Sequence, residues 1–444
     1  MSAPAPLRSP KAISTAQILP TWITRAGLRF LLITDVLVVA SFAPSYLAPF
    51  GLAYSIGAVL FAVSQGLLLG CLTLTVAALA RDRTTSVAEI LRDGLVFGIA
   101  CSLMFALVCQ FGADILRMLG QDPDVSQSGG WIMGLMALGL PLHYAYVALG
   151  YGLEAIGLHK VVAAWVALGF MLNLGLGIGI PTLLEMNAEM TSFVVAFTTV
   201  LVRLGMLLGL ILFILRTVDL RRYGACHLPK WNLPSGTALR KVGWAAGTSL
   251  AVESAAFASL SVFAGWISPT ALAAYTLLNN LVSLIFSLAL AVAVVTSAQV
   301  AAANAMADRA AARASFCMGL GLALTLMTAL GGAAFVYRNA FINFSSSDPA
   351  AVALAIPLVG LVSVLMLGDG GQVVASNALR GLGDTWSATL IHLGCYLILM
   401  VGGGWLMSIP FERGVRGLLE ATAVASFTVL IALSWRFFRL TAQR

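Results

Sequence analysis

The chain has 444 residues, of which 60% are hydrophobic and only 10% are charged, with a formal net charge of +7. Soluble domains carry about 25% charged residues, so this composition excludes a soluble globular protein and indicates a polytopic membrane protein. The positive charge does not indicate nucleic-acid binding, because the basic residues lie in short connections between apolar runs. We therefore expect the partners to be a lipid bilayer and a small molecule, and no nucleic acid.

Apolar runs bounded by charged residues, Gly or Pro predict twelve membrane-spanning helices, each of which needs about 20 apolar residues. In chain order, the predicted spans are 18–44, 50–80, 88–119, 128–153, 161–183, 190–216, 239–266, 271–304, 310–337, 350–379, 386–409 and 414–437. Five of the six cysteines lie within apolar runs, and no Cys or His spacing suits a metal. We expect an all-α integral membrane protein without a bound cofactor.

The Lys and Arg residues are distributed unevenly between the two sides of the predicted spans. Twenty fall in the N-terminal segment, the even-numbered connections and the C-terminal tail, four fall on the opposite side, and Arg203 lies within a span. Cytoplasmic loops carry an excess of Lys and Arg. The pattern therefore predicts that both termini are cytoplasmic. The short loops fit a bacterial inner membrane.

The sequence contains a weak internal repeat. LAPFGLAYS from Leu47 aligns with LAAYTLLNN from Leu272 at an offset of 225, and LEAIGLH from Leu153 aligns with LRGLGDT from Leu379 at an offset of 226. Six helices per half give the halves the same orientation, related by a pseudo-twofold axis along the membrane normal. The predicted organisation is an N-terminal tail (1–17), an N-terminal lobe (18–216), a linker (217–238), a C-terminal lobe (239–438) and a C-terminal tail (439–444).

Three acidic residues lie near the middle of predicted spans: Asp35, Glu253 and Asp369. A charged Asp at a helix centre costs about 2.5–3.5 kcal/mol on insertion scales, so such residues usually serve function. A buried carboxylate can exchange protons, or it can stay ionised and hold Na⁺ through its oxygens. Alternatively, each acid caps a neighbouring helix or pairs with Arg203. Because three acids lie at similar depth, we favour a cation-coupling role for them.

Other residues in the spans are candidate supports for these acids. His143 occupies the repeat position of Asp369, and it is interpreted as a pH-sensitive group or a hydrogen-bonded core histidine. Gly368, Gly370 and Gly371 either weaken their helix locally or allow close helix packing. Arg203 either neutralises an acid or extends towards the interface. Charges at cytoplasmic helix ends, such as Glu154 beside the turn at Gly157, are interpreted as stabilising those ends.

These residues together resemble the multidrug and toxic compound extrusion (MATE) family. The resemblance covers about residues 15–440 and rests on Pro20 ahead of Asp35, Glu253 in GTSLAVESAAF, Asp369 in GDGGQVVASNALRGLGDT, LEAIGLHK, and Asn173 in MLNLGLGIGI. It implies a twelve-helix, two-lobed exporter whose central cavity opens alternately inward and outward. Such a protein expels organic cations or amphipathic drugs in exchange for H⁺ or Na⁺, and the family resemblance also suggests a monomer.

By position, the resemblance assigns Glu253 and Asp369 to the cation site of the C-terminal lobe, which could hold Na⁺. It assigns Asp35 to the corresponding site of the N-terminal lobe. Many relatives have a tyrosine where this chain has Leu365, and often a polar residue where it has Gly177. Because these ligands are missing, we favour H⁺ over Na⁺ as the coupling ion.

Two other functions are compatible with a polytopic membrane protein. A flippase for lipid-linked oligosaccharides would need a cationic cavity for pyrophosphate, whereas the buried charges here are mostly acidic. An intramembrane lipid-modifying enzyme would need a cluster of reactive groups, whereas the four histidines are scattered. The sequence therefore favours an antiporter over an enzyme.

Overall fold

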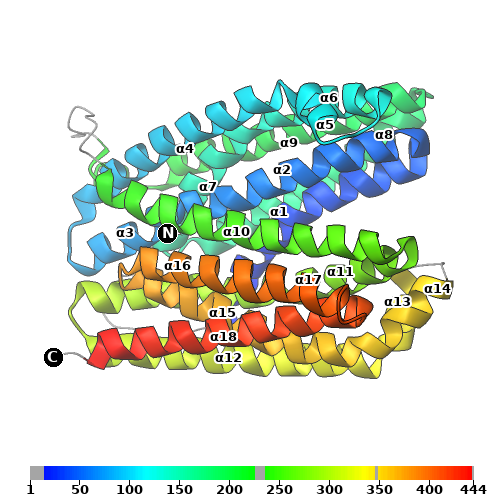
Figure 1. Cartoon of the computed structure of the whole chain (residues 1–444). Helices are drawn as coiled ribbons and strands as arrows, with labels where there is room; N and C mark the ends of the chain where they lie inside the picture. The colour runs from blue at the N-terminus through cyan, green and yellow to red at the C-terminus, as the bar shows by residue number, and fades with distance from the viewer. Residues whose placement is uncertain (1–14, 226–235, 346–348, 443–444) are drawn as a thin grey trace. The chain divides into compact units, whose positions relative to one another are not determined.

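The computed structural model describes residues 15–225, 236–345 and 349–442. Within these ranges the chain consists of helices joined by short connections, without a strand (Figure 1). Most of the predicted N-terminal tail, part of the predicted linker and the last two residues of the C-terminal tail lie outside the described residues.

The chain forms two compact units. The first comprises residues 23–247, and the second comprises residues 248–444 together with the start of the first helix as far as Trp22. The helices that lie wholly or mainly in the first unit are α1 (Thr15–Phe42), α2 (Leu47–Leu67), α3 (Leu69–Ala80), α4 (Val87–Cys109), α5 (Gly112–Met118), α6 (Pro123–Ala137), α7 (Gly139–Ala155), α8 (His159–Leu183) and α9 (Ala188–Thr217).

Helix α10 (Thr237–Ile267) begins in the first unit and continues into the second. The remaining helices of the second unit are α11 (Pro269–Ala305), α12 (Arg309–Val336), α13 (Arg338–Ser345), α14 (Pro349–Ala355), α15 (Val359–Gly381), α16 (Thr385–Cys395), α17 (Gly403–Ser408) and α18 (Gly414–Ala442). A π-helical turn, Tyr396–Gly402, connects α16 to α17.

The described residues contain eleven helical segments that are long and apolar enough to cross a membrane. Helix α1 is a further helix of 28 residues, which corresponds to about 42 Å at 1.5 Å per residue. It carries three charged residues, Arg25, Arg29 and Asp35. The helix count agrees with the twelve predicted spans.

Five of the predicted spans coincide with candidate membrane spans but are not single regular helices. The interrupted ones are 50–80, 88–119, 128–153, 350–379 and 386–409. In the fourth of these, Pro357 lies in a 3₁₀ turn, Ile356–Leu358, ahead of α15. Proline has no N–H to donate and its ring clashes with the preceding turn, so a regular helix is interrupted there. In the fifth, the π-helical turn ends at the glycine run that begins with Gly402.

Polar side chains define several helix starts. Ser268 Oγ accepts a hydrogen bond of 3.0 Å from the backbone N–H of Ala271, and Pro269 follows as the first residue of α11. Asp308 caps α12 in the same way, at 2.8 Å from Ala311 N. Such caps satisfy backbone donors that have no partner within the helix, and proline suits the first position because its missing N–H is not needed there.

The central helices of the two units are α7 and α15. Helix α7 packs against α3, α4 and α9, and α15 packs against α11, α12 and α18. His143 lies on α7 and Asp369 on α15, so the residues aligned by the internal repeat occupy corresponding central helices. After each helix the chain turns at a glycine with positive φ, Gly157 (89°) or Gly383 (87°). The turn predicted at Gly157 is confirmed, and Gly383 forms the equivalent turn in the second unit.

Candidate functional site: buried carboxylates in both units

The structure buries every predicted site residue. These predicted site residues are Asp35, His143, Asn173, Arg203, Glu253, Gly368, Asp369, Gly370 and Gly371. They do not form one cluster: the first four lie in the first unit and the others in the second. Each unit is therefore described separately.

In the first unit, Asp35 on α1 is 2% exposed and is held by side chains from α8 and α9. Asn173 Nδ2 donates to Asp35 Oδ1 at 2.6 Å, and Thr199 Oγ1 lies 2.6 Å from Asp35 Oδ2. Asn173 Nδ2 also lies 3.3 Å from the backbone oxygen of Leu31. The sequence indicated Asp35 and Asn173, whereas Thr199 is a partner that it did not identify.

The same three side chains form a closed ring, because Thr199 Oγ1 also lies 3.0 Å from Asn173 Oδ1. A threonine hydroxyl has one hydrogen, and an amide oxygen only accepts. If Asp35 is ionised, one hydrogen must serve both Asp35 Oδ2 and Asn173 Oδ1. If Asp35 is protonated, its own O–H donates to Thr199, whose hydrogen then reaches Asn173. All three contacts of the ring are full hydrogen bonds only in the protonated form.

In the second unit, Asp369 is also buried, and Gln372 Nε2 donates to its Oδ1 at 3.2 Å. Gln372 Oε1 lies 2.9 Å from His392 Nε2, and His392 Nδ1 forms a short hydrogen bond with Ser249 Oγ. This row of side chains links α15 to α16 and α10. The sequence did not identify Gln372, His392 or Ser249.

Glu253 lies on α10 one turn after Ser249, and it is 9% exposed. Residues four apart on a helix are neighbours on one face. Both Glu253 and Asp369 interact electrostatically with the Tyr396 hydroxyl, which belongs to the π-helical turn. The Tyr396 hydroxyl is therefore near both predicted acids of the second unit.

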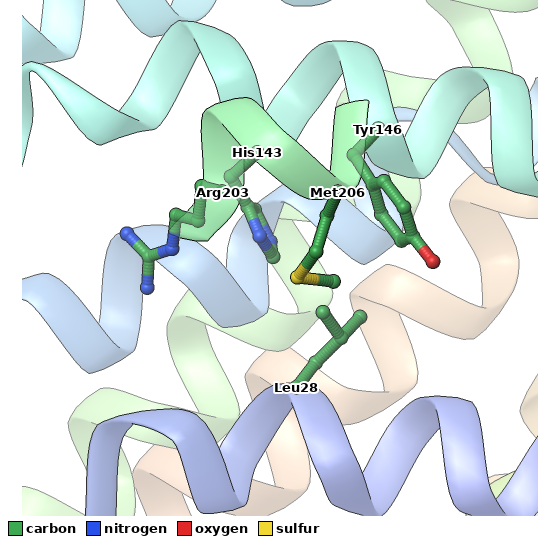
Figure 2. Close-up of a pocket in the computed structure, with 5 residues that line it drawn as sticks. All are labelled: Leu28, His143, Tyr146, Arg203 and Met206. Atoms are coloured by element: carbon green, nitrogen blue, oxygen red, sulfur yellow. The ribbon is translucent and has the colours of Figure 1, made fainter. Parts of the chain in front are cut away.

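His143 and Arg203 line a small pocket in the first unit, together with Leu28, Tyr146 and Met206 (Figure 2). It leaves no room for the centre of a water molecule, whereas ligand pockets enclose roughly 300–1,000 Å³. His143 Nε2 lies 3.1 Å from Ser64 Oγ, which agrees with a hydrogen-bonded core histidine. We therefore do not interpret this pocket as a substrate site.

The Arg203 guanidinium stacks over the Phe61 ring, with 3.7 Å between Cζ and the ring centroid. It interacts electrostatically with Asp35. The close ion pairs among the described residues do not include one between Arg203 and Asp35. Cation–π contact stabilises a desolvated guanidinium. The contacts of Arg203 are thus with an aromatic ring and, over a longer distance, with an acid.

A second buried ionic contact joins Arg25 on α1 to Glu154 at the end of α7. Arg25 Nη2 lies 2.6 Å from Glu154 Oε2, and both side chains are at most 3% exposed. The Arg25 guanidinium also lies over the Tyr151 ring, 4.5 Å from its centroid. The prediction that Glu154 only stabilises a helix end was incomplete, because its carboxylate anchors α1 on α7.

The three predicted glycines of α15 pack closely against neighbouring helices. A Cβ at Gly368 would lie 3.0 Å from the backbone nitrogen of Phe427, and one at Gly370 would lie 2.5 Å from Met327 Cγ. At Gly371 it would lie 2.8 Å from Leu430 Cδ2. Helix α15 runs without interruption through all three positions. The structure thus gives these glycines a packing role.

Replacing Gly368 by Ala is expected to destabilise the protein by about 1–3 kcal/mol, because the new methyl group meets backbone that cannot rotate away. Gly332→Ala on α12 is the matched control, since a Cβ there meets nothing within 4 Å. The measurement is the thermal unfolding midpoint of the purified variants in detergent. Equal midpoints for the two variants would contradict the packing role of Gly368.

The described residues hold no group of three His, Cys, Asp or Glu side chains that is suited to a metal ion. Two units of long apolar helices, each with a buried carboxylate that is hydrogen-bonded by neutral polar side chains, are typical of a polytopic membrane transporter. The family model described as MatE matches residues 20–178 and 245–406, so the chain belongs to the MatE family. This family consists of transporters and needs no cofactor.

Similar proteins cover almost the whole chain. A protein from Caulobacter vibrioides named "Probable multidrug resistance protein NorM" is 29% identical, over 94% of this chain and 89% of its own length. The "Multidrug resistance protein NorM" of Burkholderia vietnamiensis is 26% identical, over 100% of this chain and 97% of its own length.

Two solved structures have the same fold. The eukaryotic MATE transporter AtDTX14 has a TM-score of 0.85 at 16% identity, covering 96% of this chain and 94% of its own. A MOP superfamily transporter from Pyrococcus furiosus has a TM-score of 0.88 at 16% identity, covering 100% of this chain and 98% of its own. At this identity, the similarity is one of fold.

Proposed function

We propose that this protein is a secondary active antiporter that exports organic cations or amphipathic compounds in exchange for H⁺ by alternating access. Membership of the MatE family and the names of the NorM relatives support this function. The observation that carries it is the ring of Asp35, Asn173 and Thr199, because a buried carboxylate that gains a complete set of hydrogen bonds on protonation is suited to proton binding.

The ring also favours H⁺ over Na⁺ in the first unit. Its three side chains contact one another directly at 2.6–3.0 Å, whereas a bound cation would have to separate its oxygen ligands. The missing ligands at Leu365 and Gly177 favour the same conclusion. In the second unit Glu253 and Asp369 are the proposed cation-coupling residues, and Na⁺ at these two acids is the alternative.

The proposed mechanism is a shift between two access states. Binding of H⁺ neutralises Asp35 or Asp369 and stabilises one arrangement of the lobes 18–216 and 239–438. Substrate must bind the other arrangement more tightly, because only a difference in affinity shifts an equilibrium. Asn173 holds the acid of the N-terminal lobe, while His143 and Arg203 support the helices around it.

The test is transport by purified protein in liposomes, with ethidium as the organic cation and either a pH gradient or a Na⁺ gradient imposed. We expect the pH gradient to drive ethidium accumulation and the Na⁺ gradient alone to give only the background flux. Asp308→Asn is a suitable control, because Asp308 caps the start of α12 and is not one of the buried acids. Asparagine can form the same helix cap. Ethidium flux driven only by Na⁺ would contradict proton coupling.

A lipid-linked oligosaccharide flippase is less well supported. Of the buried arginines, Arg25 pairs with Glu154, and Arg203 stacks on Phe61 beside a pocket that has no room for a water molecule. We also propose that the protein is a monomer in a bacterial inner membrane with both termini in the cytoplasm. A reporter fused to the C-terminus and light scattering of the purified protein test the orientation and the monomer, respectively.

A further inference from the structure

A row of neutral side chains in the second unit ends at Asp369. The row runs from Ser249 through His392 and Gln372 to the carboxylate, and each of the three is at most 1% exposed. It joins three helices at a depth where unsatisfied polar groups are costly. Such a row needs every donor to face an acceptor, so its direction can be worked out.

The amide of Gln372 sets the direction of the row. Its Nε2 donates to Asp369 Oδ1 at 3.2 Å, and its Oε1 therefore faces His392 Nε2 at 2.9 Å. Because an amide oxygen only accepts, His392 carries its hydrogen on Nε2. His392 Nδ1 then accepts from the Ser249 hydroxyl. All donors point towards Asp369, which is the arrangement that an empty, ionised carboxylate requires.

A proton or a Na⁺ ion on Asp369 Oδ1, the oxygen that Gln372 Nε2 contacts, reverses the group that Gln372 must present there. A protonated Oδ1 donates rather than accepts, and a Na⁺ ion on Oδ1 attracts oxygen ligands. In both cases the amide oxygen, not the amide N–H, is the favourable group beside Asp369. Rotation of the amide then places Nε2–H opposite His392 Nε2–H. As long as the Ser249 hydroxyl donates to His392 Nδ1 and so keeps the His392 hydrogen on Nε2, this contact is between two donors, and it is lost.

We propose that the contact between Gln372 and His392 is a latch between α15 and α16, closed while the Asp369 carboxylate is empty and opened by the coupling cation. This inference rests on the proposed coupling role of Asp369. Gln372 and His392 are positioning residues in it, since they act through Asp369. The only bond that forms is the O–H bond of Asp369 when the cation is H⁺, which comes from the solution; the amide of Gln372 only rotates.

The segment that the latch would release is suited to movement. His392 stacks on Tyr396, with ring centroids 5.3 Å apart and an interplanar angle of 3°. Tyr396 begins the π-helical turn Tyr396–Gly402, and π-helical turns inside helices occur frequently at functional sites. Release of His392 thus loosens the aromatic stack that holds this turn.

Few other charges compete with the cation at this place. Arg380 on α15 interacts electrostatically with His392, and the Tyr396 hydroxyl interacts with Asp369 and with Glu253 on α10. Helix α11 carries no Asp, Glu, Lys, Arg or His, and the charged residues of α12 lie in its first two turns. The charged residues of α18 lie in the two turns at each of its ends. Asp369 is therefore the acid that the row of donors faces.

The experiment measures hydrogen exchange of the full-length protein in detergent, as protection factors for residues 385–402. The probes are protons alone, by transfer from alkaline to mildly acidic buffer, and Na⁺ alone at alkaline pH. The variants are Gln372→Met, His392→Leu and the double variant. Ser376→Ala is the matched control, because Ser376 is buried on the same helix and bonds its own helix at Val373 O. The same proteins are assayed for ethidium transport driven by a pH gradient.

For the wild type and Ser376→Ala, we expect protection of residues 385–402 to fall about tenfold when either probe binds. For both single variants and the double variant, we expect low protection under all conditions, equal among the three. Their gradient-driven transport should fall about tenfold with ethidium binding retained. The latch would be overturned if the protection of residues 385–402 in the wild type did not change with either cation. It would also be overturned if Gln372→Met transported ethidium under a pH gradient as fast as the wild type. A cation response without gradient-driven transport in the wild type would overturn the proposed function and leave the latch standing.

Discussion

Replacing Asp35 by Asn is expected to abolish export driven by a pH gradient while the protein stays folded. The new amide can donate from Nδ2 to Thr199 and accept from Asn173, as protonated Asp35 does in the ring. The variant therefore resembles a permanently protonated state that cannot release H⁺. We expect its gradient-driven ethidium flux to fall at least about tenfold and its stability to change by less than about 1 kcal/mol.

The comparison variant for this prediction is Asp35→Leu, which removes the acid and also breaks the ring. It removes the acceptor that Asn173 and Thr199 contact at 2.6 Å and leaves them only their longer hydrogen bonds, and the loss of a typical hydrogen bond costs about 0.5–1.5 kcal/mol. Lower unfolding midpoints are thus expected for Asp35→Leu but not for Asp35→Asn. If Asp35→Asn kept wild-type flux under a pH gradient, Asp35 would not be a coupling residue.

The second large effect is expected at the ion pair between Arg25 and Glu154. Replacing Arg25 by Met leaves the Glu154 carboxylate buried and unpaired, and breaking such a pair costs about 3–5 kcal/mol. The double variant Arg25→Met/Glu154→Met removes both charges, and apolar replacements of a buried pair are often neutral. We therefore expect the double variant to be more stable than Arg25→Met alone, as measured by thermal unfolding in detergent.

Arg117→Met is the control for this cycle, because Arg117 pairs with Asp114 on an exposed surface, where 48% and 67% of the two side chains are accessible. Exposed pairs contribute about 0–1 kcal/mol, so Arg117→Met should have little effect. Equal losses of stability for Arg25→Met and Arg117→Met would show that the buried pair does not anchor α1.

The number of helices and the buried acids could be predicted because both depend on local hydropathy. A bilayer tolerates few charges within a span, so Asp35, Glu253 and Asp369 were conspicuous against their apolar neighbours. The interruptions within the spans were harder to predict. Pro357 gave a local signal for one of them, but the π-helical turn at Tyr396–Gly402 has no comparable signal in an apolar run.

The partners of the acids could not be predicted, because they come from other helices. Thr199 is one of many hydroxyl residues in spans, and only the packing of α9 against its neighbours brings it to Asp35, 164 residues away in sequence. His392 was visible as a histidine in an apolar run, yet nothing in the sequence connects it with Gln372. Arg25 and Glu154 are 129 residues apart, so their pairing also depends on tertiary structure.

The central claim, that substrate and H⁺ move in opposite directions through this protein, can be measured without an imposed pH gradient. Liposomes containing the protein and a trapped pH-sensitive dye are given an ethidium gradient at equal pH on both sides. We predict that ethidium moving down its gradient drives H⁺ the other way, and that Asp35→Asn gives no such proton movement. Ethidium flux through the wild-type protein without any change in internal pH would contradict proton antiport.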